Sequence, residues 1–130
     1  MNKIIVYHAS PTCITKFNFK NGVHFGGLNS AMEAGLRKME TPEYYNQSQL
    51  YMHKCLLTLP SKIYDCDDLG STEAWLKEKE RALKDNYSLI RYLNKYEPDV
   101  VPSYYVLDSS LLQIISCNKT TTDELLHHFQ

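Results

Sequence analysis

The stretch IIVYHASP, Ile4–Pro11, is a short apolar run that ends on a histidine and closes at a proline. Its first four residues are β-branched or aromatic, which predicts a buried central strand. His8 therefore stands at the end of a core strand, directly before Ala9 and Ser10. Side chains this small let another group approach the backbone. The pattern indicates a binding position at the end of this strand.

A second histidine has a similar setting farther along the chain. Val23–Phe25 reads as a short strand that ends at Gly26 and Gly27. His8 and His24 thus both belong to short apolar strands followed by small residues, which predicts two imidazoles near one narrow opening. The alternative for either ring is a core histidine whose nitrogens are satisfied by backbone groups. No chemical role is predicted for the other histidines, His53, His127 and His128.

Composition and charge limit the class of protein. The 130 residues, 43% hydrophobic and 22% charged, are the size of one domain, which we expect to span residues 1–130. A net charge of -1 gives no global basic excess, so a nucleic-acid partner is not indicated, although a local basic groove stays open. No apolar run approaches the ~20 residues of a membrane-spanning helix, and the first residues lack a signal peptide's long apolar region. We expect a soluble, cytoplasmic protein with no membrane partner.

The four cysteines are widely spaced and form no C-x-x-C pair, so reduced thiols are expected. No metal site is predicted, because zinc-ligand spacings are absent. A phosphate-binding glycine loop is absent as well. A cysteine nucleophile is disfavoured, because Cys55 lies within an apolar strand and the other three have no adjacent histidine or basic residue in the sequence.

Hydrophobic periodicity predicts strands and helices in an irregular order. Beyond the two strands above, the predicted strands are Leu50–Leu59, Ile63–Asp65, Tyr104–Leu107 and Leu111–Ile115. The predicted helices are one after Gly27 with a capping box at Ser30–Glu33, a long one at about Thr72–Tyr96 with Ser71 as N-cap, and a short one at Leu125–Phe129. Strands at both ends with helices between them favour an α+β fold.

Three short motifs, taken in order, resemble the ADP-ribosyltransferase fold. They are Val6–Ser10 (VYHAS), Gly22–Gly26 (GVHFG) and Ser103–Asp108 (SYYVLD). In the family's histidine-tyrosine-glutamate branch, which includes poly(ADP-ribose) polymerases and diphtheria toxin, the motifs read Tyr-His-Gly-Ser/Thr, Gly-Ile-Tyr-Phe and Glu-Tyr-Val-Val-Phe-Asp. Leu50–Asp65 resembles the family's strand that leads to an aspartate-containing turn. The resemblance implies two small packed antiparallel sheets that form an NAD cleft, with flanking helices.

The resemblance also implies a role for the first motif. His8 would hydrogen-bond the ribose of NAD, and the backbone beside Ala9 and Ser10 would clamp the nicotinamide carboxamide. The bond between nicotinamide and ribose would then break through an oxocarbenium-like state. Groups that offer hydrogen bonds or negative charge to the ribose would stabilise this state more than the ground state.

The other two motifs depart from the family pattern. His24, followed by Phe25 and Gly26, takes the place of the tyrosine that packs against nicotinamide. Ser103 takes the place of the catalytic glutamate and brings no charge, a loss that typically costs on the order of 3 kcal/mol of transition-state stabilisation. Either another carboxylate replaces it in space, or the substrate supplies the base. The nearest carboxylates in the sequence are Glu97, Asp99 and Asp108, the last of which also reads as a turn residue.

Three functions stay open at this point. The first is an NAD-dependent mono-ADP-ribosyltransferase with catalytic residues His8, His24 and Ser103, similar to small phage or toxin transferases and to anti-CRISPR or other anti-defence effectors. Its macromolecular target would be a protein. The second is an RNA 2'-phosphotransferase-like enzyme, which needs arginines around its motifs, whereas the arginines here fall on predicted helices. The third is a catalytically inactive transferase fold that binds a partner.

Overall fold

The structure is a computed structural model, and it describes the chain except residues 1, 20–21, 42, 44–48, 94–100 and 122–130. The elements follow in the order β1 (Lys3–Ser10), β2 (Val23–Phe25), α1 (Leu28–Met39), β3 (Gln49–Thr58), β4 (Tyr64–Asp67), α2 (Thr72–Lys84), β5 (Leu89–Leu93), β6 (Ser103–Val106), a 3-10 turn (Ser109–Leu111) and β7 (Leu112–Thr121). No helix among the described residues is long and apolar enough to cross a membrane.

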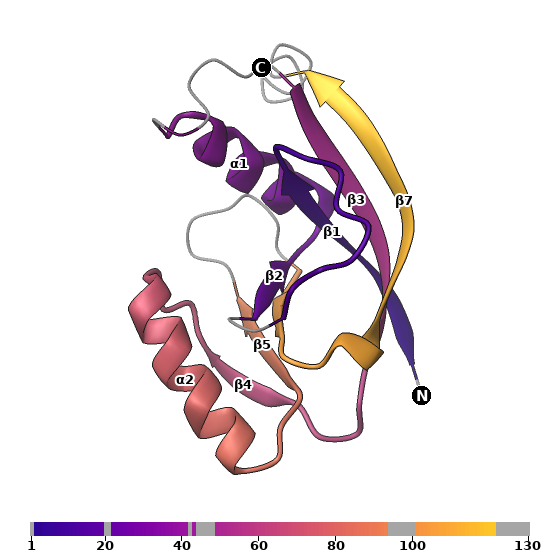
Figure 1. The fold of residues 1–130 in the computed structure, drawn as a ribbon. Helices are drawn as coiled ribbons and strands as arrows, with labels where there is room; N and C mark the ends of the chain where they lie inside the picture. The colour runs from indigo at the N-terminus through magenta and orange to yellow at the C-terminus, as the bar shows by residue number, and fades with distance from the viewer. Residues whose placement is uncertain (1, 20–21, 42, 44–48, 94–100, 122–130) are drawn as a thin grey trace.

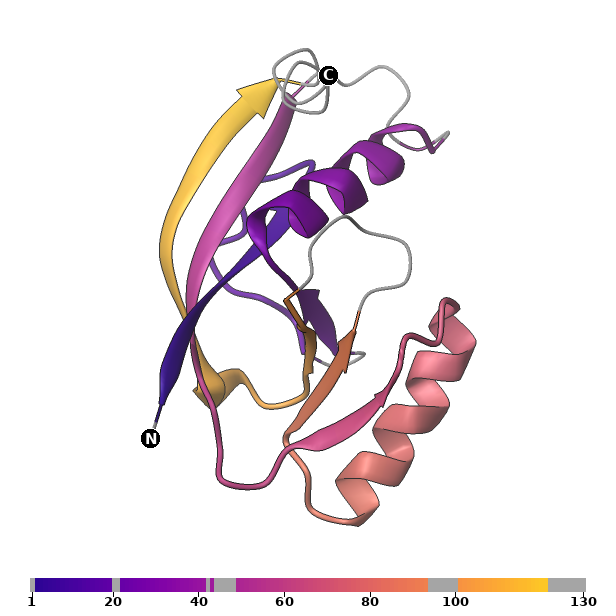
Figure 2. The ribbon, with the colours of Figure 1, turned by 180° about the vertical axis from the view of Figure 1, so that it is seen from behind.

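The strands form two sheets, and each helix lies beside one of them (Figures 1 and 2). One sheet has three antiparallel strands in the order β1-β3-β7, and the other has four strands in the order β2-β6-β5-β4. The expected α+β class with two small sheets is confirmed. The expectation that both sheets are antiparallel is wrong, because β4 and β5 run parallel. Helix α2 connects these two strands, and a parallel pair requires such a crossover.

A backbone bridge joins the two sheets beside the first two motifs. The N–H of Tyr7 donates to the carbonyl oxygen of Gly26 at 2.8 Å, and the N–H of Gly26 donates back to the carbonyl oxygen of Tyr7 at 3.0 Å. Strand β1 belongs to the three-stranded sheet, and Gly26 directly follows β2 of the four-stranded sheet. The ends of both predicted motifs are therefore held side by side.

Apolar residues of both sheets make the main core. Its buried members are Val6, Phe17, Phe25, Cys55, Leu57, Leu89, Tyr104 and Val106. Helix α1 packs on the three-stranded sheet with little room to spare, because a Cβ at Gly35 would lie 2.6 Å from a methyl group of Leu50 and 2.7 Å from the Cβ of Ala9. Helix α2 covers the four-stranded sheet through Trp75 and Ala82.

The long predicted helix is about half as long as expected. Helix α2 begins after Ser71, whose side chain accepts a hydrogen bond from the N–H of Ala74 at 3.2 Å, so the predicted N-cap is confirmed. The helix ends at Lys84, and Asn86 adopts a left-handed φ of 64°. Asparagine tolerates this conformation better than most residues. The apolar residues beyond it form the buried strand β5, so their assignment to the helix was wrong.

One further expectation needs correction. Helix α1 begins directly after Gly27, and Ser30 lies buried within its first turn, so a capping box at Ser30 is wrong. Strands β6 and β7 belong to different sheets, although they are close in sequence. Asp108 separates them and accepts a hydrogen bond from the N–H of Ser110 at 2.9 Å, as a turn residue would. The predicted helix Leu125–Phe129 lies outside the described residues.

Candidate functional site

A cavity of about 440 Å³ opens beside the bridge between the two sheets. Its volume falls within the range of roughly 300–1,000 Å³ that small-molecule sites occupy. Strands β1 and β2, helix α1 and the start of α2 all contribute to its wall. Six of the residues proposed from the sequence line it: His8, Ala9, His24, Phe25, Gly26 and Ser103.

Gly26 allows the third motif to approach the second. A Cβ at this position would lie 2.8 Å from the Oγ of Ser103, closer than van der Waals contact permits. Strand β6, which starts at Ser103, pairs antiparallel with β2, and Phe25 lies opposite Tyr104. The three sequence motifs therefore meet at one place in the fold.

His8 is held in a defined neutral form. Its Nδ1 lies 2.7 Å from the carbonyl oxygen of His24, and because a carbonyl can only accept, Nδ1 carries the proton. Burial, together with the nearby charge of Lys38, lowers the pKa of His8 to about 4. Nε2 has no hydrogen-bond partner among the described residues, and no unpartnered side-chain nitrogen or oxygen there is buried. Nε2 is thus an accessible hydrogen-bond acceptor.

His24 sits in an aromatic frame. Its Nδ1 and the hydroxyl of Tyr92 are 2.7 Å apart, and its ring meets Trp75 and Tyr105 edge-on at centroid distances of 4.9 and 4.5 Å. Burial lowers the pKa of His24 to about 4, so this ring is also neutral near pH 7. Trp75 and Tyr92 line the cavity as well. The sequence analysis missed both as site residues, because both fall within the one long helix predicted at about Thr72–Tyr96.

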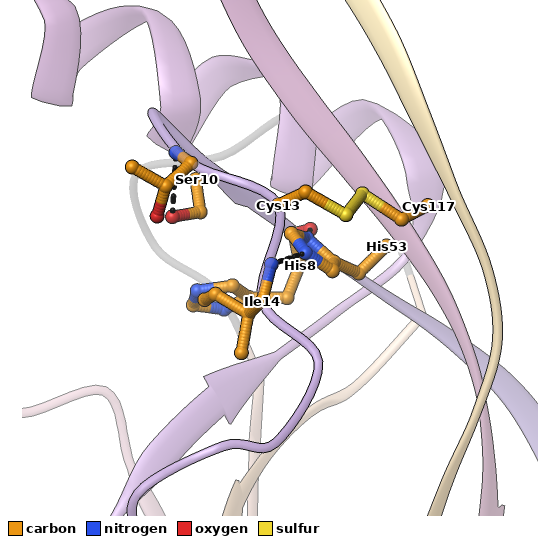
Figure 3. Close-up of a disulfide and its surroundings, with 7 residues drawn as sticks. His8, Ser10, Cys13, Ile14, His53 and Cys117 are labelled. Atoms are coloured by element: carbon orange, nitrogen blue, oxygen red, sulfur yellow. Dashed lines mark hydrogen bonds between the residues drawn. A yellow bond between two sulfur atoms is a disulfide. The ribbon is translucent and has the colours of Figure 1, made fainter.

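Ser10 does not belong to the cavity wall. Its side chain is buried, and its Oγ accepts a hydrogen bond from the N–H of Thr12 at 3.4 Å (Figure 3). The residue shapes the turn that follows β1. A direct role for the Ser10 side chain in ligand binding is therefore not supported by its position, whereas Ala9 lies at the cavity as predicted.

The disulfide Cys13–Cys117 and the side chain of His53 lie near His8 (Figure 3). A disulfide joins Cys13 to Cys117, so the expectation of four reduced thiols is wrong for these two residues. Sequence could not reveal the pair, because 104 positions separate its members. The fully buried His53 lies beside them; its Nδ1 is 3.0 Å from the carbonyl oxygen of His8, and its Nε2 accepts from the N–H of Ile14 at 2.7 Å.

Cys13, His53 and Cys117 are residue types that can ligate a metal ion, and they lie close together. The sulfur atoms of Cys13 and Cys117 and a ring nitrogen of His53 lie within 4.8 Å of one another. However, the sulfurs are bonded to each other and both nitrogens of the imidazole are engaged, so the group acts as a structural link here. The remaining cysteines suit inert thiols, because burial raises the pKa of Cys55 and of Cys66 to about 11.

Asp68 brings a carboxylate to the cavity wall. It follows β4, is half-buried, and accepts a hydrogen bond from the N–H of Gly70 at 3.3 Å. Its negative charge favours the protonated form of His24, against the larger effect of burial. Of the carboxylates named from the sequence, Asp108 is not among the lining residues, and Glu97 and Asp99 lie outside the described residues. Nothing in the sequence showed that Asp68 lines the same cavity as the histidines.

Helix α1 brings positive charge to the cavity wall, through Arg37 and Lys38. The other arginines lie elsewhere: Arg81 pairs with Glu78 at 3.2 Å, and Arg91 pairs with Asp65 at 2.6 Å. Arg91 is on strand β5, not on a helix as predicted. One arginine at the cavity weakens the analogy with RNA 2'-phosphotransferases, which use several.

No protein-family model matches this chain, and no curated protein matches it in sequence. The resemblance to ADP-ribosyltransferases stays a prediction from the three motifs.

Proposed function

We propose that this protein is an NAD-dependent mono-ADP-ribosyltransferase that modifies a macromolecular target, most simply a protein. The observation that carries the proposal is His8: a neutral imidazole with an accessible Nε2 acceptor, in a cavity bordered by Ala9 and by the second and third motifs. A ribose hydroxyl is a donor that this acceptor suits. The net charge of -1 gives no reason to prefer a nucleic-acid target.

The residues present fit NAD in three respects. Ala9 is small and lines the cavity, so no large side chain stands between a carboxamide and the backbone there. Trp75 and Tyr92 offer aromatic faces or edges beside the neutral ring of His24, which suits a planar nicotinamide. NAD supplies an ADP-ribosyl group on a bond to a good leaving group, so the protein's task is to orient that bond and to stabilise positive charge on the ribose.

Asp68 is the residue we assign to the electrostatic part of this task. Ser103 can only exchange hydrogen bonds with a sugar hydroxyl, whereas a carboxylate stabilises developing positive charge. Asp68 faces the same cavity as His8 and His24. We infer that it replaces, from another element of the fold, the charge that the glutamate supplies in related enzymes.

A labelled-NAD assay tests the proposal. The protein is incubated with NAD labelled on the adenylate, with and without a cell lysate, and both protein-bound label and free nicotinamide are measured. Label on a lysate protein, lost in the Asp68→Asn variant, supports a transferase. Release of nicotinamide without transfer indicates an NAD hydrolase. Absence of both reactions contradicts the enzymatic proposal.

One observation favours a second candidate function. The position that matches the catalytic glutamate holds Ser103, which is buried against Gly26 and carries no charge. An inactive transferase fold that binds NAD or a partner protein would retain the cavity and lose this group. Binding of NAD measured by calorimetry, with neither reaction in the assay above, supports this candidate.

A further inference from the structure

Lys38 carries a positive charge into the cavity, and the described part of the chain offers it no anionic partner. Its ammonium group donates to the carbonyl oxygen of Ala9 at 3.4 Å, and no carboxylate contacts it among the described residues. Burial lowers its pKa, which shows that water does not fully solvate the charge. A partly desolvated cation is normally paired, because leaving it alone is costly.

The other residues that α1 contributes to the cavity wall near Lys38 are small. Ala31, Ala34 and Lys38 lie three, four and seven positions apart on α1, which places them on one helical stripe, and all three line the cavity. The two alanines present only methyl groups, so the stripe is shallow until it reaches the lysine. Arg37, which is exposed, lines the cavity beside it.

We propose that Lys38, with Arg37, forms a phosphate-binding subsite that takes the diphosphate of the dinucleotide. This inference rests on the proposed function for the identity of the whole ligand, but the subsite itself requires only a phosphate group. An ammonium group has three donors, and one bond to Ala9 leaves two for phosphate oxygens. The histidines beside it are neutral, so the positive charge of this cavity comes from Arg37 and Lys38 of α1. The ligand would thus lie with its diphosphate at α1 and its nicotinamide ribose at His8.

Inorganic pyrophosphate is the probe, titrated by calorimetry into four proteins. These are the wild type, Lys38→Met, Lys38→Arg and the matched control Lys54→Met, which removes an equal charge from an exposed position outside the cavity. The wild type should bind pyrophosphate, Lys38→Met should bind about tenfold more weakly, equivalent to about 1.4 kcal/mol, and Lys38→Arg should retain most of the affinity. Lys54→Met should match the wild type. The thermal midpoint of each variant confirms that it is folded.

Absence of pyrophosphate binding by the wild type, or equal affinity in the wild type and Lys38→Met, overturns the subsite. A second comparison separates this failure from that of the proposed function. Lys38→Met should weaken binding of NAD but not of nicotinamide riboside, which has no phosphate. If the protein binds pyrophosphate through Lys38 but neither binds nor consumes NAD, the subsite stands and the NAD proposal falls. If NAD is consumed equally well by Lys38→Met, the NAD proposal stands and the subsite falls.

Discussion

The Nδ1 atom of His8 donates a hydrogen bond to the backbone carbonyl oxygen of His24, across 2.7 Å. Two strands from different sheets are thereby locked together at the point where the sequence places its first two motifs. The bond also fixes the tautomer of His8, so that Nε2 must be an acceptor. The strand-end histidine is therefore both a structural tie and the best-placed ligand for a sugar hydroxyl.

The two roles of His8 can be separated by substitution. In His8→Asn, the side-chain amide N–H can occupy the position of Nδ1 and keep the bond to the carbonyl of His24, but nothing replaces Nε2. We expect this variant to fold and to bind NAD about fivefold more weakly, since a hydrogen bond is worth roughly 1 kcal/mol. His8→Ala should lose NAD binding altogether. Equal NAD affinity in wild type and His8→Asn, measured by calorimetry, contradicts the assignment.

Neither Asp68 nor Ser103 should be needed for NAD binding, whereas Asp68 should be needed for turnover of NAD. Asp68→Asn keeps the shape of the side chain and removes the charge, so turnover of NAD should fall by about 10²-fold, the typical effect of removing one preorganised electrostatic group, with little change in NAD affinity. Ser103→Ala should leave NAD binding largely intact. Nicotinamide release measured against NAD concentration separates the two effects. Unchanged turnover in Asp68→Asn excludes this carboxylate from the chemistry.

Local sequence signals predicted the parts of the fold that depend on local physics. The strand before His8, the short strand at His24 and the N-cap at Ser71 follow from hydrophobic pattern and capping, and the structure confirms them. The expectation that the first strand is buried and central was wrong, because β1 lies at the edge of its sheet and Ile5 is exposed. The cavity position of Ala9 followed from the order of motifs. Ser10 does not line the cavity, because its side chain turns toward its own loop. The expected role of the backbone beside it stays a prediction.

The errors arose where distant contacts override local pattern. Leu89 and Ile90 continue the helical periodicity of α2, but the left-handed Asn86 ends the helix and the sheet buries both residues. The carboxylate of Asp68 and the ammonium of Lys38 come from separate elements, and only the packing of α1 and of the loop after β4 brings them to one cavity. The spacing of residues in a single sequence does not show that two such side chains line the same cavity.

Acidification should destabilise the protein between pH 6.5 and 4. The pKa values of His8 and His24 are lowered by burial from 6.5 to about 4, so in this window the unfolded chain binds protons that the folded chain does not. The associated stability is complete above pH 6.5 and is lost as the pH falls through 4, on the order of 3 kcal/mol for each ring. Urea unfolding at several pH values measures it. His24→Phe, which keeps an aromatic ring, should show a shallower loss; an identical pH dependence contradicts the prediction.

The disulfide between Cys13 and Cys117 predicts a thiol count and a stability change. Denatured, unreduced protein should show two reactive thiols, those of Cys55 and Cys66. Reduction should lower the free energy of unfolding by about 2–4 kcal/mol, since the bond closes a long loop of the unfolded chain. Cys117→Ser should behave like the reduced protein and gain nothing from an oxidant. A count of four thiols in protein purified without reductant shows that the bond does not form.

Gly26 and Ser103 provide a test of the motif junction that does not depend on any ligand. A methyl group at position 26 would lie 2.8 Å from the Oγ of Ser103, so Gly26→Ala forces the two strands apart or displaces the hydroxyl. Overpacking of this kind typically lowers the free energy of unfolding by about 1–3 kcal/mol. Ser103→Ala removes the oxygen that the methyl group meets, so the double variant should recover much of the loss, and the two substitutions should be strongly non-additive. Additive effects in a double-mutant cycle of urea unfolding would show that Ser103 does not face Gly26, and the convergence of the second and third motifs on the cavity would then be wrong.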